Sequence, residues 1–93
     1  AYGHGLIPCA RLYEQAGVDY LGVAYLEEGI QLRVAGIRSP ILVLGGILHS
    51  QIKFFLDYDL DILASSVFKL DAIEQQARAS GKKARVHLKI DTG

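Results

Sequence analysis

The first residues of the chain have the composition of a phosphate-binding loop. Tyr2, Gly3 and Gly5 lie directly ahead of a helical pattern that has Pro8 in its first turn. Backbone N–H groups at a helix N-terminus bind phosphate readily, and a tyrosine hydroxyl can add a hydrogen bond. The loop has neither the GxGxxG pattern of dinucleotide sites nor the P-loop pattern, so a plain turn is the alternative.

A second group of chemically capable residues lies near the other end, in the segment 85–91. Polar and apolar residues alternate there, and successive side chains of a strand point to opposite faces. We therefore expect Val86, Leu88 and Ile90 to meet helices. The other face would point into a barrel and carry His87, Lys89 and Asp91, the last two at the carboxyl end of the strand, where barrel enzymes place their chemistry. The alternative is an edge strand of an open sheet with one solvated face.

The remaining residues with catalytic or metal-binding potential form no such group. The three histidines are His4, His49 and His87, and their spacing does not match a metal site. Cys9 falls on the expected apolar face of a helix, so we expect a packed thiol and not a nucleophile. No GxSxG motif occurs.

Helix and strand patterns that alternate regularly must position these residues. Strands are predicted at 20–24, 41–44, 61–64 and 84–90. Apolar faces at helical spacing are expected at Cys9, Leu12, Tyr13 and Ala16 in the first helix, and at Leu26, Ile30 and Val34 in the second. A third helix would be capped by Ser50 and bury Ile52, Phe55 and Leu56, and a fourth would be capped by Ser66, bury Leu70, Ile73 and Ala77, and end at Gly81.

The strand centres lie about 20–25 residues apart, which is the repeat of a βα unit and calls for a parallel sheet with helical crossovers. A whole (β/α)₈ barrel needs about 250 residues. The fold class predicted is therefore α/β, a partial TIM barrel of about half the strands. Residues 1–93 would form one fragment of a barrel domain, without an internal domain boundary.

Composition excludes several classes of protein. The chain has 93 residues, of which 51% are hydrophobic, and ten Lys and Arg balance ten Asp and Glu. A disordered chain and a basic surface for nucleic acid or anionic lipid are thereby excluded. No apolar run approaches the roughly 20 residues that span a bilayer, and we see no signal peptide. One cysteine fits a reducing cytoplasm.

The chain has no methionine, and both ends are interpreted as cuts through a longer protein, with a processed mature domain as the alternative.

Three segments together resemble a known enzyme family. The opening AYGHG resembles the end of the KANAYGHG signature of alanine racemases, and the ending LKIDTG resembles the segment leading into their DTGMxR stretch. Between them, residues 18–46 are similar to the second and third βα units of that family. The resemblance runs through the whole chain in register.

The resemblance implies an isomerase that interconverts L- and D-alanine with pyridoxal 5'-phosphate, supplies D-alanine for peptidoglycan and works as a homodimer. Tyr2 matches the tyrosine that touches the cofactor phosphate. Leu44 matches an apolar residue near the pyridine ring. Lys89 matches a lysine that several members carry in carbamylated form and that orients an arginine.

Three groups of the family mechanism would lie outside these residues. The lysine that holds the cofactor as a Schiff base would be the third residue before Ala1, the arginine would follow Gly93, and a tyrosine base would come from the partner subunit's C-terminal domain. The chain alone is therefore expected to be inactive. Two alternatives stay open: another pyridoxal-phosphate-dependent racemase or decarboxylase, and a non-catalytic barrel that binds the cofactor in vitamin B6 homeostasis.

Overall fold

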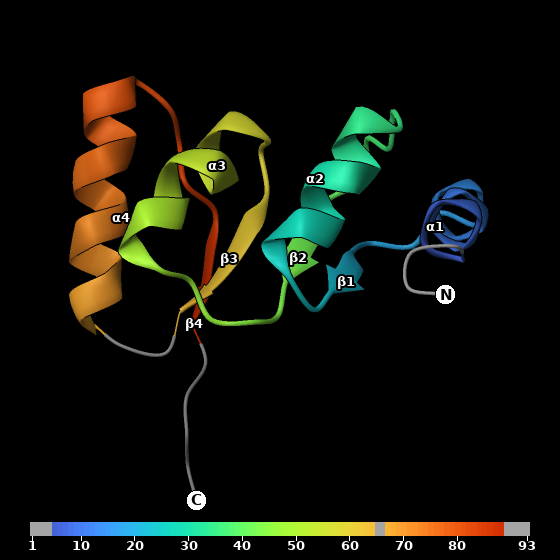
Figure 1. The fold of residues 1–93 in the computed structure, drawn as a ribbon, viewed down its shortest axis with the longest axis horizontal. Coiled ribbons are helices and arrows are strands. Elements are labelled where there is room, and N and C mark those ends of the chain that lie inside the picture. The colour runs from blue at the N-terminus through green and yellow to red at the C-terminus, as the bar shows by residue number, and fades with distance from the viewer. Residues whose placement is uncertain (1–4, 65–66, 89–93) are drawn as a thin grey trace, which may run out of the picture.

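The computed structural model describes residues 5–64 and 67–88, which alternate between helices and strands (Figure 1). The helices are α1 (Leu6–Gln15), α2 (Leu26–Val34), the short 3₁₀ turn η1 (His49–Gln51), α3 (Ile52–Asp57) and α4 (Val67–Ser80). The strands are β1 (Leu21–Val23), β2 (Ile41–Val43), β3 (Asp61–Ala64) and β4 (Val86–Leu88). Each expected element is present; β1 and β2 are shorter than expected, and β4 begins at Val86 instead of residue 84.

The four strands form one sheet in the order β1-β2-β3-β4, and every neighbouring pair is parallel. Leu21 pairs with Ile41, and Ile62 pairs with both Val43 and Val86. The strands follow one another in the sheet in the same order as in the chain, and a helix lies in each connection. This is the arrangement of successive βα units. The expected α/β class with parallel strands is confirmed.

The core lies between one face of the sheet and the helices, which follow one another along that face (Figure 1). The strand residues on this face are almost fully buried: Leu21, Val23, Ile41, Val43 and Ile62. α2 packs closely on the sheet at Gly29, where a Cβ would lie 3.1 Å from Leu60 Cδ1 and 3.5 Å from Val43 Cγ2. Val86 packs against the same core, as expected for the apolar set of the last strand.

The opposite face of the sheet is the inward face of the curved sheet, and no helix within residues 5–64 and 67–88 covers it. By alternation and register it carries Tyr20, Gly22, Leu42, Asp61, Leu63, Arg85 and His87. Asp61 is buried, and the other six of these residues are exposed or half-buried. Leu88 belongs to β4, but the structure does not describe its side chain.

Some expected helix faces are wrong. Cys9, Leu12 and Tyr13 are exposed on α1, and the residue of that helix buried against the sheet is Ala10. The reason is that α1 lies at the edge of the sheet and meets it through one small side chain flanked by Leu6 and Ile7. In α2, Leu26 is buried as expected, but Val34 is 75% exposed, and Leu32 is buried in its place.

The third and fourth helices agree better with the sequence. α3 buries Ile52, Phe55 and Leu56 as expected, although Ser50 does not cap it: the turn before α3 is capped by the Gln51 side chain. α4 buries Ile73 and Ala77. The expected cap, Ser66, lies outside the described residues. None of the described helices is both long and apolar enough to cross a membrane.

Candidate functional site

The carboxyl ends of β1 and β2 are joined by hydrogen bonds that continue beyond the strands. The N–H of Leu44 donates to the carbonyl of Val23 at 2.7 Å, and the N–H of Gly45 donates to the carbonyl of Ala24 at 2.9 Å. A Cβ at Gly45 would lie only 2.4 Å from the Ala24 oxygen, so no other residue fits there without a shift of the backbone. Gly45 therefore holds the two strand ends together at the edge where parallel α/β proteins bind ligands.

Leu44 presents an apolar side chain on the inward face at this edge. It is 54% exposed, and its Cδ1 lies 3.5 Å from the position that a Cβ of Gly22 would take. The missing side chain at Gly22 thus makes room for Leu44 to lie over β1. The result is an uncovered apolar surface beside the strand ends.

The helix N-termini at this edge are not equivalent. In α2, Glu28 Oε1 accepts hydrogen bonds from the N–H groups of Ala24, at 2.9 Å, and Tyr25, at 3.0 Å. In the same way, Gln51 Oε1 accepts from the N–H of Leu48. The first residue before α1 is Gly5, which has no side chain with which to cap it. Gly5 itself therefore supplies no side-chain cap to α1, and N–H groups at such a helix start can bind an anion.

A polar cluster lies on the inward face at the start of β3. Asp61 is completely buried. Its Oδ1 accepts from Arg85 Nε at 2.8 Å, and its Oδ2 lies 2.8 Å from His87 Nε2. Hydrogen bonds to Asp59 and Asp61, the first of these strongest, raise the pKa of Arg85 above its ordinary value, so the guanidinium stays charged. We name Asp61, Arg85 and His87 the floor cluster.

A second network at the amino ends of the strands is built from backbone groups. Arg33 donates from Nε and both Nη atoms to four carbonyl oxygens, those of Ile37, Ser39, Tyr58 and Asp59. Burial lowers the pKa of Arg33 from its ordinary value. Such contacts hold loops together and leave the guanidinium little capacity for a ligand.

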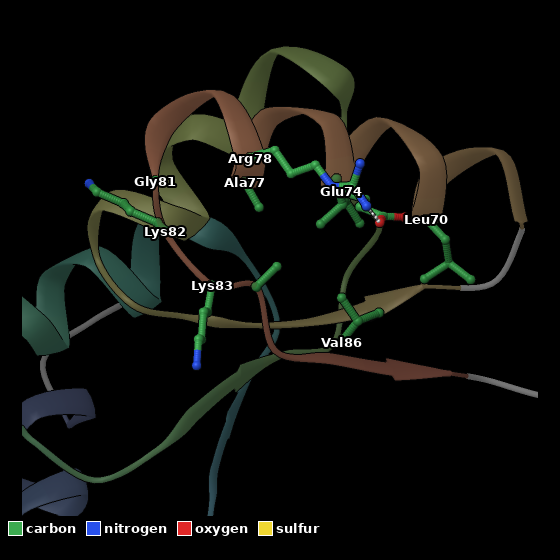
Figure 2. A pocket seen from close by; sticks show the side chains of 10 residues that line it. Leu70, Glu74, Ala77, Arg78, Gly81, Lys82, Lys83 and Val86 are labelled. Carbon is green, nitrogen blue, oxygen red and sulfur yellow. Dashed lines mark hydrogen bonds and ion pairs between the residues drawn. The ribbon is translucent and has the colours of Figure 1, made fainter.

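An open groove of about 610 Å³ lies between α4 and β4 (Figure 2). Leu70, Ala77 and Val86 point into it, while Lys82 and Lys83 extend away from it. Glu74 and Arg78 pair with each other above it at 2.7 Å. The groove lies on the helix-covered face, not on the inward face, and brings no group together that could perform chemistry.

Comparison with known proteins agrees with this geometry over the whole chain. Residues 1–93 match the family described as alanine racemase, N-terminal domain. The chain belongs to this family. The alanine racemase 1 of Oceanobacillus iheyensis is 44% identical over 92 residues, which are 99% of this chain and 24% of that protein.

Solved structures of the alanine racemase fold superimpose closely. The alanine racemase of Clostridium difficile 630 has a TM-score of 0.93 at 41% identity and covers all of this chain, which is 24% of that structure. A histidine racemase from Leuconostoc mesenteroides has a TM-score of 0.85 at 31% identity, over 100% of this chain and 25% of its own. The chain thus spans about a quarter of the length of these relatives.

The structure places some of the sequence-predicted residues within this racemase-type fold. Leu44 lies at the strand ends, as described above. Tyr2, Lys89 and Asp91 lie outside the described residues, as do Gly3 and His4. His49 lies 3.5 Å from Gln76, and Cys9 is exposed, which corrects the expectation of a packed thiol. Within 5–64 and 67–88 no three metal-ligating side chains come together.

Sequence reasoning did not find Asp61 or the cap at Glu28. The signal for Asp61 was present, because a carboxylate at the start of an otherwise apolar strand needs a partner. Its partners, Arg85 and His87, lie two dozen residues further along the chain. The Glu28 side chain accepts hydrogen bonds from the N–H groups of Ala24 and Tyr25, four and three residues before it.

Proposed function

We propose that this chain is the amino-terminal part of a pyridoxal-phosphate-dependent alanine racemase, which interconverts L- and D-alanine. Its barrel domain would continue beyond these residues, and the whole enzyme would be a cytoplasmic homodimer that supplies D-alanine for peptidoglycan. The observation that carries the proposal is the match of all 93 residues to the family, together with 44% identity to an alanine racemase.

The described residues fit the cofactor. A phosphate group requires N–H donors, and we propose that those at the start of α1 supply them, because Gly5 has no side chain to cap that helix start. A pyridine ring requires an apolar surface, and the exposed side chain of Leu44 supplies it. We propose that Tyr2 donates its hydroxyl to the phosphate and that Leu44 packs beside the ring.

When bound, pyridoxal phosphate supplies an electron sink that stabilises the carbanion formed as the α-proton leaves. The residues of this chain bind and orient the cofactor. Gly45 fixes the ends of β1 and β2, and Lys89 would position an arginine as a free or carbamylated side chain. Proton transfer itself would use a lysine before Ala1 and a tyrosine of the partner subunit.

A second candidate is the racemisation of a different amino acid. The observation that favours it is the 31% identity to a histidine racemase over the full chain. None of the described residues selects between the two side chains.

The deciding experiment is an assay of the full-length protein with pyridoxal phosphate. Interconversion of L- and D-alanine is followed by chiral chromatography, alongside histidine and other amino acids at the same concentration. A value of kcat/KM for alanine well above the others supports the proposal. A clear preference for histidine selects the second candidate, and no turnover of any amino acid contradicts both.

A further inference from the structure

Two consecutive peptide groups at the carboxyl end of β1 are hydrogen-bonded on both sides. The first donates the N–H of Ala24 to Glu28 Oε1 at 2.9 Å, and its carbonyl accepts from the N–H of Leu44 at 2.7 Å. The second donates the N–H of Tyr25 to the same oxygen at 3.0 Å, and its carbonyl accepts from the N–H of Gly45 at 2.9 Å. Glu28 and residues 44–45 therefore hold the same two peptide groups from opposite sides.

The shape of a peptide group connects these two sides. It is planar and trans, so its N–H and C=O point in opposite directions and cannot turn independently. Two N–H groups fixed on one carboxylate oxygen therefore fix the direction of both carbonyl groups, toward Leu44 and Gly45. A charged acceptor makes stronger hydrogen bonds than a neutral one, and it polarises the peptide group so that the C=O is a better acceptor as well.

Glu28 acts from a fixed position, whereas Leu44 has little packing of its own. Glu28 lies in the first turn of α2, and its own N–H donates to the carbonyl of Tyr25 at 3.2 Å. The buried side chains of Leu26 and Leu32 fix α2 on the sheet. The side chain of Leu44 is 54% exposed, so its backbone, more than its packing, sets where it points.

We propose that Glu28 is a positioning residue for the cofactor: through the two peptide groups it holds the backbone of residues 44–45 and thereby the apolar side chain of Leu44. This inference rests on the proposed function, which assigns Leu44 to the pyridine ring. It differs from a role in the helix dipole alone, which Glu27 in the same turn would share. The exposed side chain of Glu27 makes no hydrogen bond within residues 5–64 and 67–88.

Amide hydrogen exchange of the full-length protein without cofactor measures the effect on the backbone. In Glu28→Ala we expect the N–H groups of Leu44 and Gly45 to exchange about threefold to tenfold faster. The N–H of Leu21, which donates to the carbonyl of Pro40 at the other end of the same strand pair, should keep its rate. Equal acceleration at Leu21 would show a general loss of stability and would overturn the inference.

Two further variants are matched to this one. Glu28→Gln keeps an acceptor oxygen, as Gln51 does before α3, and should keep the exchange at Leu44 slow. Glu27→Ala removes a carboxylate from the same helical turn and should also leave the exchange unchanged. Acceleration by Glu27→Ala as large as that by Glu28→Ala would reduce the role of Glu28 to the helix dipole and contradict the proposal.

A double-mutant cycle measures the effect on the cofactor, with the dissociation constant of pyridoxal phosphate determined by absorbance titration. Glu28→Ala alone should weaken binding about threefold or more. In the Leu44→Ala background the same substitution should have almost no further effect, because the side chain through which Glu28 acts is gone. Equal fold-changes in both backgrounds, or none in either, would overturn the inference. Ile73→Val, a change in the core at α4, is the stability control: it should lower Tm without changing the affinity.

The unaltered full-length protein separates the two ways in which this can fail. If it neither binds pyridoxal phosphate nor racemises an amino acid, the proposed function fails and the inference fails with it. If it does both, and Glu28→Ala changes neither the exchange at Leu44 nor the affinity, the inference alone fails.

Discussion

Tyr20 and His87 touch across the inward face although one directly precedes β1 and the other lies on β4, at opposite edges of the sheet. Their ring centroids are 5.2 Å apart. Two edge strands can meet in this way only if the sheet between them is strongly curved, as in a barrel. The contact also explains why Asp61, which lies between them, is completely buried on a face that none of the described helices covers.

Removal of the buried carboxylate should destabilise the protein. In Asp61→Ala, Arg85 and His87 lose their partner, but both are partly exposed and can reach water. We therefore expect a loss of about 1–3 kcal/mol, the cost of unmade hydrogen bonds, and not the larger cost of stranding a buried charge. Urea unfolding of the full-length protein measures it. Glu74→Ala is the control, since it removes an exposed ion pair and should cost less than about 0.5 kcal/mol.

Neighbouring glycines should differ sharply in their response to a methyl group. Gly45→Ala places a Cβ 2.4 Å from the Ala24 oxygen, whereas a Cβ at Gly46 meets nothing within 4 Å. We expect Gly45→Ala to cost about 1–3 kcal/mol by overpacking and to weaken cofactor binding, because the strand ends must separate. Gly46→Ala should leave both nearly unchanged. Equal effects of the two substitutions in unfolding and cofactor titration would refute the assignment.

Acid should weaken the link between α1 and the loop before β2. The N–H groups of Arg38 and Ser39 donate to Glu14 Oε2 and, with Arg38 as the largest cause, lower the pKa of Glu14 from its ordinary 4.5. A lowered folded-state pKa gives stability that is present above about pH 4.5 and is lost as the pH falls through the folded-state pKa. Glu14→Gln should flatten the pH dependence of Tm in that window. Ser39→Ala keeps both backbone donors and should behave almost as the unaltered protein.

Leu44 should matter for the cofactor and little for folding. Its side chain is 54% exposed, so truncation in Leu44→Ala removes little buried surface. We expect a Tm within a few degrees of the unaltered protein and several-fold weaker binding of pyridoxal phosphate, measured by absorbance titration. Leu48→Ala is the matched control, because Leu48 is 64% exposed and lies in the loop after β2. If both variants bind the cofactor normally, the assigned role of Leu44 is wrong.

The 93-residue chain should have no racemase activity by itself. The proposal places both proton-transfer groups outside it, and each such group contributes roughly 10²–10⁴-fold to the rate. The measurement is D/L-alanine interconversion by the purified chain with added pyridoxal phosphate, compared with the cofactor alone. Turnover far above that control would show that the catalytic groups have been misassigned.

Much of the fold could be predicted because the signals are local. The apolar run at Ile41–Val43 and the spacing of the βα repeat depend on neighbours in the chain, and the structure confirms them. The buried face of α1 could not be predicted in the same way. Which side of an amphipathic helix is covered depends on where the helix lies on the sheet, and α1 lies at its edge, with Leu12 66% exposed.

In the candidate site, too, residues fixed by local sequence could be predicted, and residues brought together by strand pairing could not. Leu44 follows directly from the strand that precedes it and from the family resemblance. The floor cluster joins Asp61 to residues 24 and 26 positions away, so its existence depends on the register of β3 and β4. No local pattern fixes that register. The alternation in β4 correctly placed His87 on the inward face, but it could not name the carboxylate that holds it.

The strands have the same order in the sheet as in the chain, and this has a consequence for folding during translation. Each strand pairs with the one before it, about 19–24 residues earlier, as Leu21 with Ile41, Leu42 with Asp61 and Ile62 with Val86. A ribosome adds about 5–20 residues per second, while loops of this size close in far less than a millisecond. Each of β2, β3 and β4 therefore emerges from the ribosome after the strand with which it pairs. The sheet can grow at one edge during translation, and β4 need not wait for any later segment to find its place.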